Sequence, residues 1–193
     1  MKKILIALII IVAIIISIIF ITTNHQTSTK IDKSAKILVV YFSAQNHTKE
    51  VALKIANDLN ADLFEITPSK KYSESDLDWT NQNSRVSKEH NNKKLQEVKL
   101  KTTKVPNWNQ YDTIILGYPI WYSEAAWPVT SFVKANNFTN KKIIPFCTSA
   151  SSSIGNSAKS LGQIAGSGNW QEGTRFQSNA QVQEIEEWLA KIK

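Results

Sequence analysis

Apolar positions between residues 36 and 192 follow two different spacings. Short runs in which nearly every residue is apolar alternate with longer stretches in which apolar residues recur every three or four positions. A short, uniformly apolar run is typical of a strand buried on both faces of a parallel sheet, whereas the wider spacing is typical of a helix with one buried face. Their alternation predicts an α/β domain in which helices cover both faces of a parallel sheet.

The same pattern sets the bounds of the expected elements. The clearest helix is predicted over residues 47–59, whereas residues 69–107 are mostly polar and contain one weak helical pattern, over residues 86–98. The predicted strands are 36–42, 61–67, 113–117, 142–147 and 169–176, and the other predicted helices are 127–135, 154–165 and 182–192. In the closing helix, the residues expected to face the core are Val182, Ile185, Leu189 and Ile192.

An apolar segment precedes this domain. Residues 4–21 contain one polar residue, Ser17, and follow the basic pair Lys2 and Lys3. At about 1.5 Å per residue, a helix of this length approaches the thickness of the hydrocarbon core of a bilayer. We therefore predict an N-terminal apolar helix that anchors the chain in a membrane. A cleaved signal segment, which would make the domain a secreted protein, is the alternative.

The flanks of this segment indicate where the domain lies. Residues 20–29 offer no small residues suited to cleavage, which favours the uncleaved anchor. Because Lys2 and Lys3 precede the span, the soluble domain is expected on the extracytoplasmic side, although Lys30 on the far side opposes this assignment. The predicted organisation is an anchor or signal segment at 1–21, a polar tether at 22–35 and a single domain at 36–193.

Composition and charge narrow the classes of function. The 193-residue chain has a net charge of +7, but its basic residues are scattered, so no nucleic-acid-binding surface is expected. Cys147 is the single cysteine, which excludes an internal disulfide, and the spacing of the three histidines predicts no metal site. The sequence also lacks the glycine-rich dinucleotide and P-loop motifs and the Gly-x-Ser-x-Gly turn of serine hydrolases.

Three loops rich in hydroxyl, amide or aromatic side chains come directly after three of the predicted strands. They are residues 43–48, 118–124 and 148–155. In a parallel α/β sheet, ligands bind beyond the carboxyl ends of the strands, at the point where the strand order reverses. The three loops are therefore expected to meet at one ligand site.

Each loop suits a different part of a ligand. The first leads into a helix, whose unpaired N–H groups and dipole favour a phosphate; the alternative is that Ser43 or Asn46 only caps the helix. Trp121 and Tyr122 in the second loop can stack on a planar ring, or they only cover the sheet edge. The third loop offers five hydroxyls to a polar ligand edge, or it is a flexible serine-rich turn.

These loops resemble the flavin-binding loops of flavodoxins. Residues 41–48, Tyr-Phe-Ser-Ala-Gln-Asn-His-Thr, are similar to the flavodoxin phosphate loop, in which Ser/Thr-x-Thr-Gly-x-Thr follows a strand. Residues 117–122, Gly-Tyr-Pro-Ile-Trp-Tyr, resemble the ring-stacking loop of a small flavodoxin-like subgroup, and residues 146–157 resemble the loop on the other side of that ring. Residues 173–176 and the closing helix are also similar, so the resemblance covers about residues 36–192.

The resemblance implies a flavodoxin-like three-layer sandwich, with a five-stranded parallel sheet between helices, that binds FMN non-covalently. It implies that the first loop holds the phosphate, the second flanks the isoalloxazine ring, and the third faces the polar edge of the ring and the ribityl chain. No catalytic side chain is implied, because the flavin carries the chemistry. The implied FMN-binding residues are Ser43, Gln45, Asn46, His47 and Thr48, then Pro119, Ile120, Trp121 and Tyr122, and finally Thr148, Ser149, Ser151, Ser153 and Gly155.

Two departures from the flavodoxin pattern affect the expected chemistry. Gln45 and Asn46 stand where the family usually has Thr and Gly, so FMN affinity is expected to be lower than usual. Asn is the best substitute if the glycine position needs a positive φ. Residues 118–126 contain no glycine, and a glycine beside the ring often helps flavodoxins to stabilise the one-electron-reduced flavin. We therefore expect a preference for two-electron chemistry.

The expected function is that of a membrane-anchored, FMN-binding redox protein that exchanges electrons with a partner protein or a quinone-like molecule. The sequence leaves two alternatives open: an FMN-dependent NAD(P)H:quinone-type reductase, and a flavin-free binding module on the same fold. The missing loop glycines favour the enzyme, whereas the small size and the absence of a nucleotide-binding motif favour an electron carrier.

Overall fold

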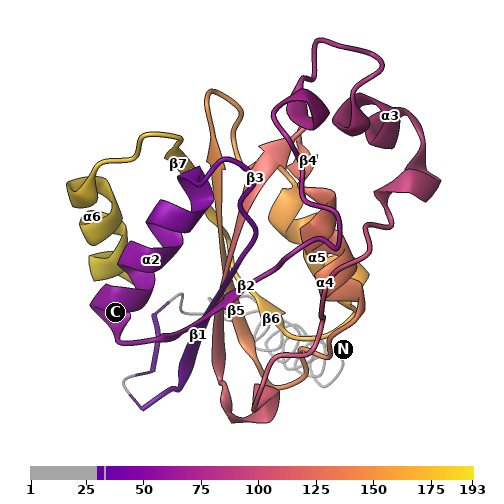
Figure 1. Cartoon of the computed structure of the whole chain (residues 1–193). Coiled ribbons are helices and arrows are strands. Elements are labelled where there is room, and N and C mark those ends of the chain that lie inside the picture. Colours follow the sequence, from indigo (N-terminus) through magenta and orange to yellow (C-terminus); the bar gives the residue numbers. More distant parts are fainter. Residues whose placement is uncertain (1–29, 33) are drawn as a thin grey trace, which may run out of the picture.

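The sheet is parallel, as the sequence predicts. The computed structural model describes residues 30–32 and 34–193, and its central strands are β1 (Ile37–Tyr41), β2 (Asp62–Glu65), β3 (Thr113–Trp121) and β5 (Lys142–Ser149). Parallel pairing joins β1 to β2 and β3, and β3 to β5, which gives the order β2-β1-β3-β5 (Figure 1). The order reverses between β1 and β3, so a ligand is expected beyond the carboxyl ends of these strands.

The last predicted strand is divided into two. β6 (Asn169–Trp170) and β7 (Thr174–Gln177) pair in parallel with the first and last parts of β5, and together they occupy the fifth position in the sheet. Gly173 lies between them, where a Cβ would come within 2.3 Å of Ile154 Cδ1 and 2.9 Å of the Pro145 carbonyl oxygen. The chain passes so close to its neighbours here that only glycine fits.

β3 is longer than predicted and turns back on itself. Residues 118–121 are expected in a loop, yet they continue the strand, and Ile120 and Trp121 pair antiparallel with β4 (Glu124–Ala125). Tyr122 and Ser123 form the turn with φ values of 49° and 65°. Two successive left-handed residues are what a two-residue type I′ turn requires, and such turns usually contain Gly, Asn or Asp. The sequence lacks that signal, so the hairpin was not predicted.

Helices cover both faces of the sheet. Figure 1 shows α2 (His47–Leu59) and α6 (Val182–Ile192) on one face, with α4 (Trp127–Lys134) and α5 (Ser157–Ala165) on the other. The buried residues of α2 recur at helical spacing, and the helix has the predicted bounds. The predicted arrangement of a sheet between two helical layers is therefore confirmed.

One core residue of the closing helix is wrongly predicted. Ile185, Leu189 and Ile192 are buried, but Val182 is 50% exposed. A helical side chain leans toward the helix N-terminus. The side chain of the first residue therefore extends beyond the helix instead of lying over it.

Residues 70–99, called the 70–99 segment below, form an irregular excursion that Figure 1 shows above β4, at the carboxyl end of the sheet. It contains η1 (Ser75–Leu77), α3 (Arg85–Asn91) and η2 (Lys93–Gln96), and η3 (Trp108–Gln110) follows before β3. The helix predicted over residues 86–98 is wrong in its second half. Asn92 leaves the helical region, and its side chain accepts a hydrogen bond from the Lys94 N–H at the start of η2.

The packed part of the chain begins before residue 36. Ile31, in the predicted tether, is buried among residues of α2 and α6, and its N–H donates to the Ile192 carbonyl at 2.5 Å. The predicted N-terminal apolar helix at 4–21 lies outside the described residues. Within the part of the chain that is described, no helix is both long and apolar enough to cross a membrane.

Candidate functional site

A cavity of about 620 Å³ opens beyond the carboxyl ends of β1, β3 and β5. This volume is usual for a small-molecule site, and its position is the one expected for a ligand of a parallel α/β sheet. Residues from all three predicted loops line it. The predicted site residues among them are Ser43, Gln45, His47, Thr48, Pro119, Ile120, Trp121, Tyr122, Thr148, Ser149 and Ser151.

Three predicted site residues do not line the cavity: Asn46, Ser153 and Gly155. The third loop reaches the cavity with residues 148–152, so Ser153 and Gly155 lie past it. Asn46 and Gly155 both have a positive φ, of 69° and 51°. These two residues shape their loops through backbone conformation and not through contact with the cavity.

The start of α2 has the features of an anion site. Gln45, Asn46 and His47 are exposed there, and the Asn46 side chain makes no cap hydrogen bond. The first N–H groups of a helix have no partner within it, so they and the helix dipole favour an anion. Asn46 thus occupies the capping position without capping the helix, and the capping alternative fails for this residue.

A buried hydroxyl pair joins the first loop to the third. Thr48 Oγ1 and Thr148 Oγ1 lie 2.7 Å apart, and both residues are almost fully buried. Because Thr48 is in the first turn of α2 and Thr148 is near the end of β5, this hydrogen bond fixes the distance between two walls of the cavity.

The aromatic side chains of the second loop are held from outside the sheet. Trp121 packs edge-on against Tyr72, with ring centroids 4.9 Å apart. Tyr122 stacks on His90 at 3.8 Å with nearly parallel planes, and its hydroxyl lies 3.0 Å from Ser87 Oγ. Both aromatic residues also line the cavity, so they do more than cover the sheet edge. Tyr72, His90 and Ser87 belong to the 70–99 segment, and Trp127 of α4 packs against both aromatic rings from within the domain.

Arg175 on β7 holds the third loop. Its Nε donates to Ser149 Oγ at 2.9 Å, and one terminal nitrogen donates to the carbonyls of Ser149 and Ala150 at 3.0 and 2.9 Å. Ser149 Oγ in turn donates to the Ser152 carbonyl. These hydrogen bonds close the loop, which argues against the alternative of a flexible serine-rich turn.

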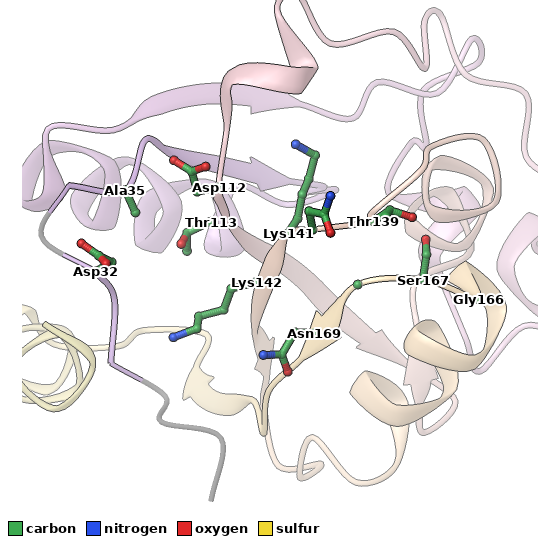
Figure 2. Close-up of a pocket in the computed structure, with 12 residues that line it drawn as sticks. Asp32, Ala35, Asp112, Thr113, Thr139, Lys141, Lys142, Gly166, Ser167 and Asn169 are labelled. Atoms are coloured by element: carbon green, nitrogen blue, oxygen red, sulfur yellow. The ribbon is translucent and has the colours of Figure 1, made fainter. Parts of the chain in front are cut away.

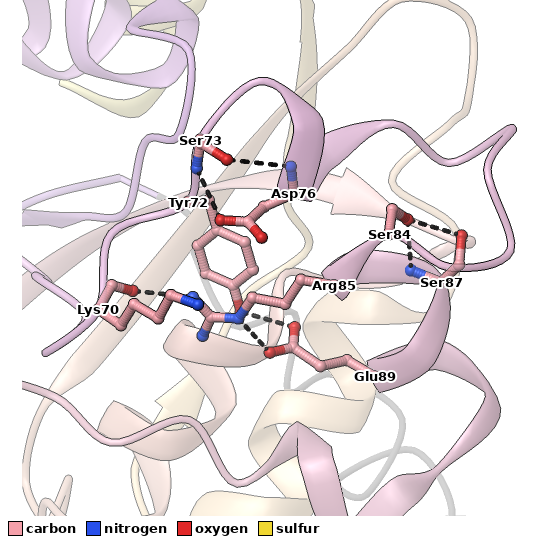
Figure 3. Close-up of polar contacts among 8 residues, drawn as sticks. All are labelled: Lys70, Tyr72, Ser73, Asp76, Ser84, Arg85, Ser87 and Glu89. Atoms are coloured by element: carbon pink, nitrogen blue, oxygen red, sulfur yellow. Dashed lines mark hydrogen bonds and ion pairs between the residues drawn. The ribbon is translucent and has the colours of Figure 1, made fainter.

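A buried ion pair anchors the 70–99 segment (Figure 3). Glu89 is 5% exposed and accepts hydrogen bonds from Arg85 Nε at 2.6 Å and from the Tyr72 hydroxyl at 2.7 Å. The Arg85 guanidinium also lies 3.7 Å from the Tyr72 ring centroid and donates to the Lys70 carbonyl. Burial, with the bond to Glu89, raises the pKa of Tyr72, so its hydroxyl stays protonated as a donor. Tyr72 thereby connects this network to Trp121.

The sequence did not predict one wall of the cavity. Leu77, Trp79 and Val86 of the 70–99 segment line it, and the Trp79 side chain is 69% exposed. A tryptophan in a polar stretch is a weak signal for this role, because only tertiary contacts bring the segment to the cavity. The other lining residues that were not predicted are Ala44, Ser123, Ala150, Ser152 and Ser178.

Titratable groups in the strands below the cavity do not indicate covalent catalysis. Cys147 is fully buried, and burial raises the pKa of its thiol to about 12, so it is no thiolate nucleophile at neutral pH. Burial likewise raises the pKa of Tyr118, whose hydroxyl lies 3.1 Å from Ser157 Oγ. Among the described residues, no group of His, Cys, Asp and Glu is arranged to hold a metal ion.

A second hollow lies at the opposite end of the sheet (Figure 2). Residues at the amino ends of β3, β5 and β6 line it, among them Asp112, Lys141 and Lys142. Lys141 Nζ donates to the Tyr111 carbonyl at 2.6 Å, and Lys142 Nζ donates to the Lys30 carbonyl at 2.5 Å. The ammonium groups of Lys141 and Lys142 thus both donate hydrogen bonds to main-chain carbonyls. None of the predicted site residues lines this hollow. The cavity at the carboxyl ends is therefore the candidate site.

Several known proteins resemble this chain in sequence and fold. A family model described as flavodoxin matches residues 36–192. A protein classed as a flavoprotein from Bacteroides eggerthii DSM 20697 is 38% identical, with a TM-score of 0.73 over 82% of this chain and 98% of that chain. Its counterpart from Bacteroides uniformis ATCC 8492 is 36% identical, with a TM-score of 0.74 over 82% of this chain and 99% of that chain.

A more distant similarity shows the fold alone. A flavoprotein from Lactobacillus acidophilus NCFM, solved in complex with FMN, is 23% identical, with a TM-score of 0.55 over 80% of this chain and 99% of that chain. No curated protein matches this chain.

Proposed function

The chain belongs to the flavodoxin family, and we propose that it is an FMN-binding redox protein that exchanges electrons with a second molecule. The resemblance to flavodoxins over residues 36–192 is confirmed. One observation supports the proposal above all: the start of α2, the end of β3 and the third loop meet at one cavity.

The residues that line the cavity fit FMN. The start of α2 offers N–H groups and hydroxyls to a phosphate, and no Asp or Glu is among the described lining residues, so a phosphate dianion meets no like charge there. Trp121 and Tyr122 present aromatic surface to a planar ring. The third loop adds hydroxyls and main-chain groups suited to the polar edge of that ring. The cofactor is FMN, held without a covalent bond.

Bound FMN supplies one- and two-electron redox chemistry, and the chain supplies binding and orientation. The start of α2 fixes the phosphate end of the site. The β3–β4 hairpin, pinned by His90 and Ser87, fixes the aromatic wall, and Arg175 fixes the loop opposite. Because these walls are set by hydrogen bonds and stacking within the protein, they need little rearrangement when a ligand binds.

A second candidate is an FMN-dependent reductase of a quinone-like acceptor that uses a reduced nicotinamide nucleotide. The observation that favours it is the conformation of Tyr122 and Ser123, which are already left-handed and held to α3. A pinned turn opposes the backbone change that helps flavodoxins to stabilise the one-electron-reduced flavin. The pinned turn therefore favours two-electron chemistry, which is the chemistry that a reductase uses.

We also propose that the domain is held on the outer side of a membrane. The support is the sequence of residues 4–21, which is long and apolar enough for a span, with Lys2 and Lys3 before it. Membrane fractionation followed by protease treatment of intact cells tests this. Recovery of the chain in the soluble cytoplasmic fraction would contradict it.

Titration of the flavin-free full chain with FMN, in detergent, tests the proposed function. We expect saturable quenching of FMN fluorescence with a shifted flavin absorption band, and weaker binding of riboflavin, which lacks the phosphate. No saturable binding would overturn the proposal and favour a flavin-free binding module. If FMN binds, an assay of NAD(P)H oxidation with a quinone distinguishes the two functions. A reductase catalyses this oxidation, whereas an electron carrier does not.

A further inference from the structure

Three residues of the cavity wall belong to none of the loops assigned to FMN. Leu77, Trp79 and Val86 all come from the 70–99 segment, and all three side chains are apolar. We propose that they form a subsite, beside the FMN site, for a planar and uncharged electron acceptor of the quinone class. This inference rests on the proposed function, because the acceptor takes its electrons from bound FMN.

Trp79 has the exposure expected of a ligand-contacting side chain. It is 69% exposed although it lines the cavity, whereas Val86 on the same wall is 3% exposed. Covering so large an apolar side chain removes area from water, at about 25 cal/mol per Å². An indole face also favours offset stacking with another planar ring. A flat conjugated acceptor gains from both effects.

The subsite is built on a fixed part of the chain. The Trp79 carbonyl lies 3.4 Å from both Ser87 Oγ and the Tyr122 hydroxyl, which are 3.0 Å from each other. Two residues outside α3 also hold the helix (Figure 3): the Tyr72 hydroxyl donates to Glu89, and the Lys70 carbonyl accepts from Arg85. A wall that is ordered before the ligand arrives loses little entropy on binding.

The charge of the wall selects an uncharged acceptor. No Asp, Glu, Lys or Arg is among the described residues that line this cavity. The nearby charges of Arg85 and Glu89 neutralise each other at 2.6 Å. The side chains of Leu77, Trp79 and Val86 therefore offer no cation to a strongly anionic ligand or an acidic protein surface, whereas a neutral quinone loses little hydration against them.

The proposed overall reaction needs one reductant, a reduced nicotinamide nucleotide. A reduced nicotinamide nucleotide, a proton and a quinone give the oxidised nucleotide and the hydroquinone. Bound FMN would supply the two-electron transfer, and the two carbonyl oxygens of the quinone gain two protons, one of which comes from solvent.

Binding of 1,4-naphthoquinone to the FMN-loaded full chain tests the subsite without turnover. The readout is the change in the absorption band of oxidised flavin at equilibrium, with protein-free detergent micelles as the blank. We expect Trp79→Ala to raise the Kd for naphthoquinone about tenfold, and Trp79→Phe, which keeps an aromatic face, to restore it largely. The Kd for FMN should stay unchanged in both variants.

Leu95→Ala is the matched control. Leu95 is also an apolar residue of the 70–99 segment and is 48% exposed, but it does not line the cavity. We expect it to leave the Kd for naphthoquinone unchanged. Ferricyanide, a small inorganic acceptor that needs no ring stacking, should oxidise the reduced protein equally fast in all variants.

Two results would overturn the inference while leaving the proposed function intact. One is an unchanged Kd for naphthoquinone in Trp79→Ala. The other is an equal loss of FMN and naphthoquinone binding in that variant, which would make Trp79 part of the flavin site itself. Failure of the unmodified chain to bind FMN would instead refute the proposed function.

Discussion

The backbone of Asn46 explains how this chain tolerates its main departure from the usual flavodoxin phosphate loop. Its φ of 69° lies in the left-handed region, which Asn enters more readily than other residues that carry a side chain. The Asn46 side chain does not line the cavity, but it stands at the N-cap of α2, beside the N–H groups proposed to hold the phosphate. We predict that Asn46→Gly tightens FMN binding about fivefold, or about 1 kcal/mol, as measured by fluorescence quenching.

Asn60→Gly provides the control for this prediction. Asn60 is the C-cap of the same helix and also has a left-handed backbone, with a φ of 47°. It lies at the far end of α2, so its replacement should leave the Kd for FMN unchanged. Riboflavin should bind equally well to both variants and to the unmodified chain. An equal gain in FMN affinity from both substitutions would assign the effect to the helix and not to the phosphate site.

Arg175 is the residue on which the geometry of the third loop depends. It makes three hydrogen bonds to Ser149 and Ala150, and bonds to a charged group contribute about 1.5–3 kcal/mol each. We predict that Arg175→Gln weakens FMN binding at least about tenfold, because the loop loses its fixed shape. Arg175→Lys should recover little, since an ammonium cannot reproduce the planar fork of a guanidinium. Titration with FMN measures both, and a Kd within twofold of the unmodified chain would contradict the prediction.

At the scale of elements, the 70–99 segment depends on its buried ion pair. Removing one partner of such a pair costs about 3–5 kcal/mol, because the other charge stays buried and unpaired. Glu89→Gln removes the carboxylate from Arg85, but Arg85 is 19% exposed and keeps its bond to the Lys70 carbonyl, so the cost lies below that range. The substitution also weakens the acceptor for the Tyr72 hydroxyl. We expect amide hydrogen exchange to accelerate throughout the 70–99 segment, while β1 and β3 remain protected.

Glu97→Gln is the corresponding control within the same segment. Glu97 lies 3.7 Å from Lys134, but its side chain is 76% exposed. Exposed pairs contribute about 0–1 kcal/mol, so exchange in the segment should hardly change. Faster exchange in β1 and β3 of the Glu89→Gln variant would show that the ion pair supports the whole domain and not this element alone.

At the scale of the whole molecule, the sequence predicts best what short-range patterns determine. α2 has its predicted bounds because its buried residues recur at helical spacing. The site loops were found because polar residues that follow buried parallel strands must meet at one edge of the sheet. The β3–β4 hairpin was missed because Tyr122 and Ser123 stand where a type I′ turn usually has Gly or Asn. Trp79 was missed because contacts such as Ser87–Tyr122, 35 residues apart in the chain, bring its wall to the cavity.

Two aliphatic residues test where the packed molecule begins. Ile31 lies in the predicted tether but is 8% exposed, whereas Val182 was expected in the core and is 50% exposed. Truncating a buried isoleucine to alanine costs about 2–5 kcal/mol, and an exposed substitution usually changes stability by less than about 0.5 kcal/mol. We therefore expect Ile31→Ala to lower the free energy of unfolding by about 2 kcal/mol and Val182→Ala to change it little. Denaturant unfolding of the full chain, followed by tryptophan fluorescence, measures both. The reverse order would mean that the chain around residue 31 is a tether, as its polar sequence alone indicates.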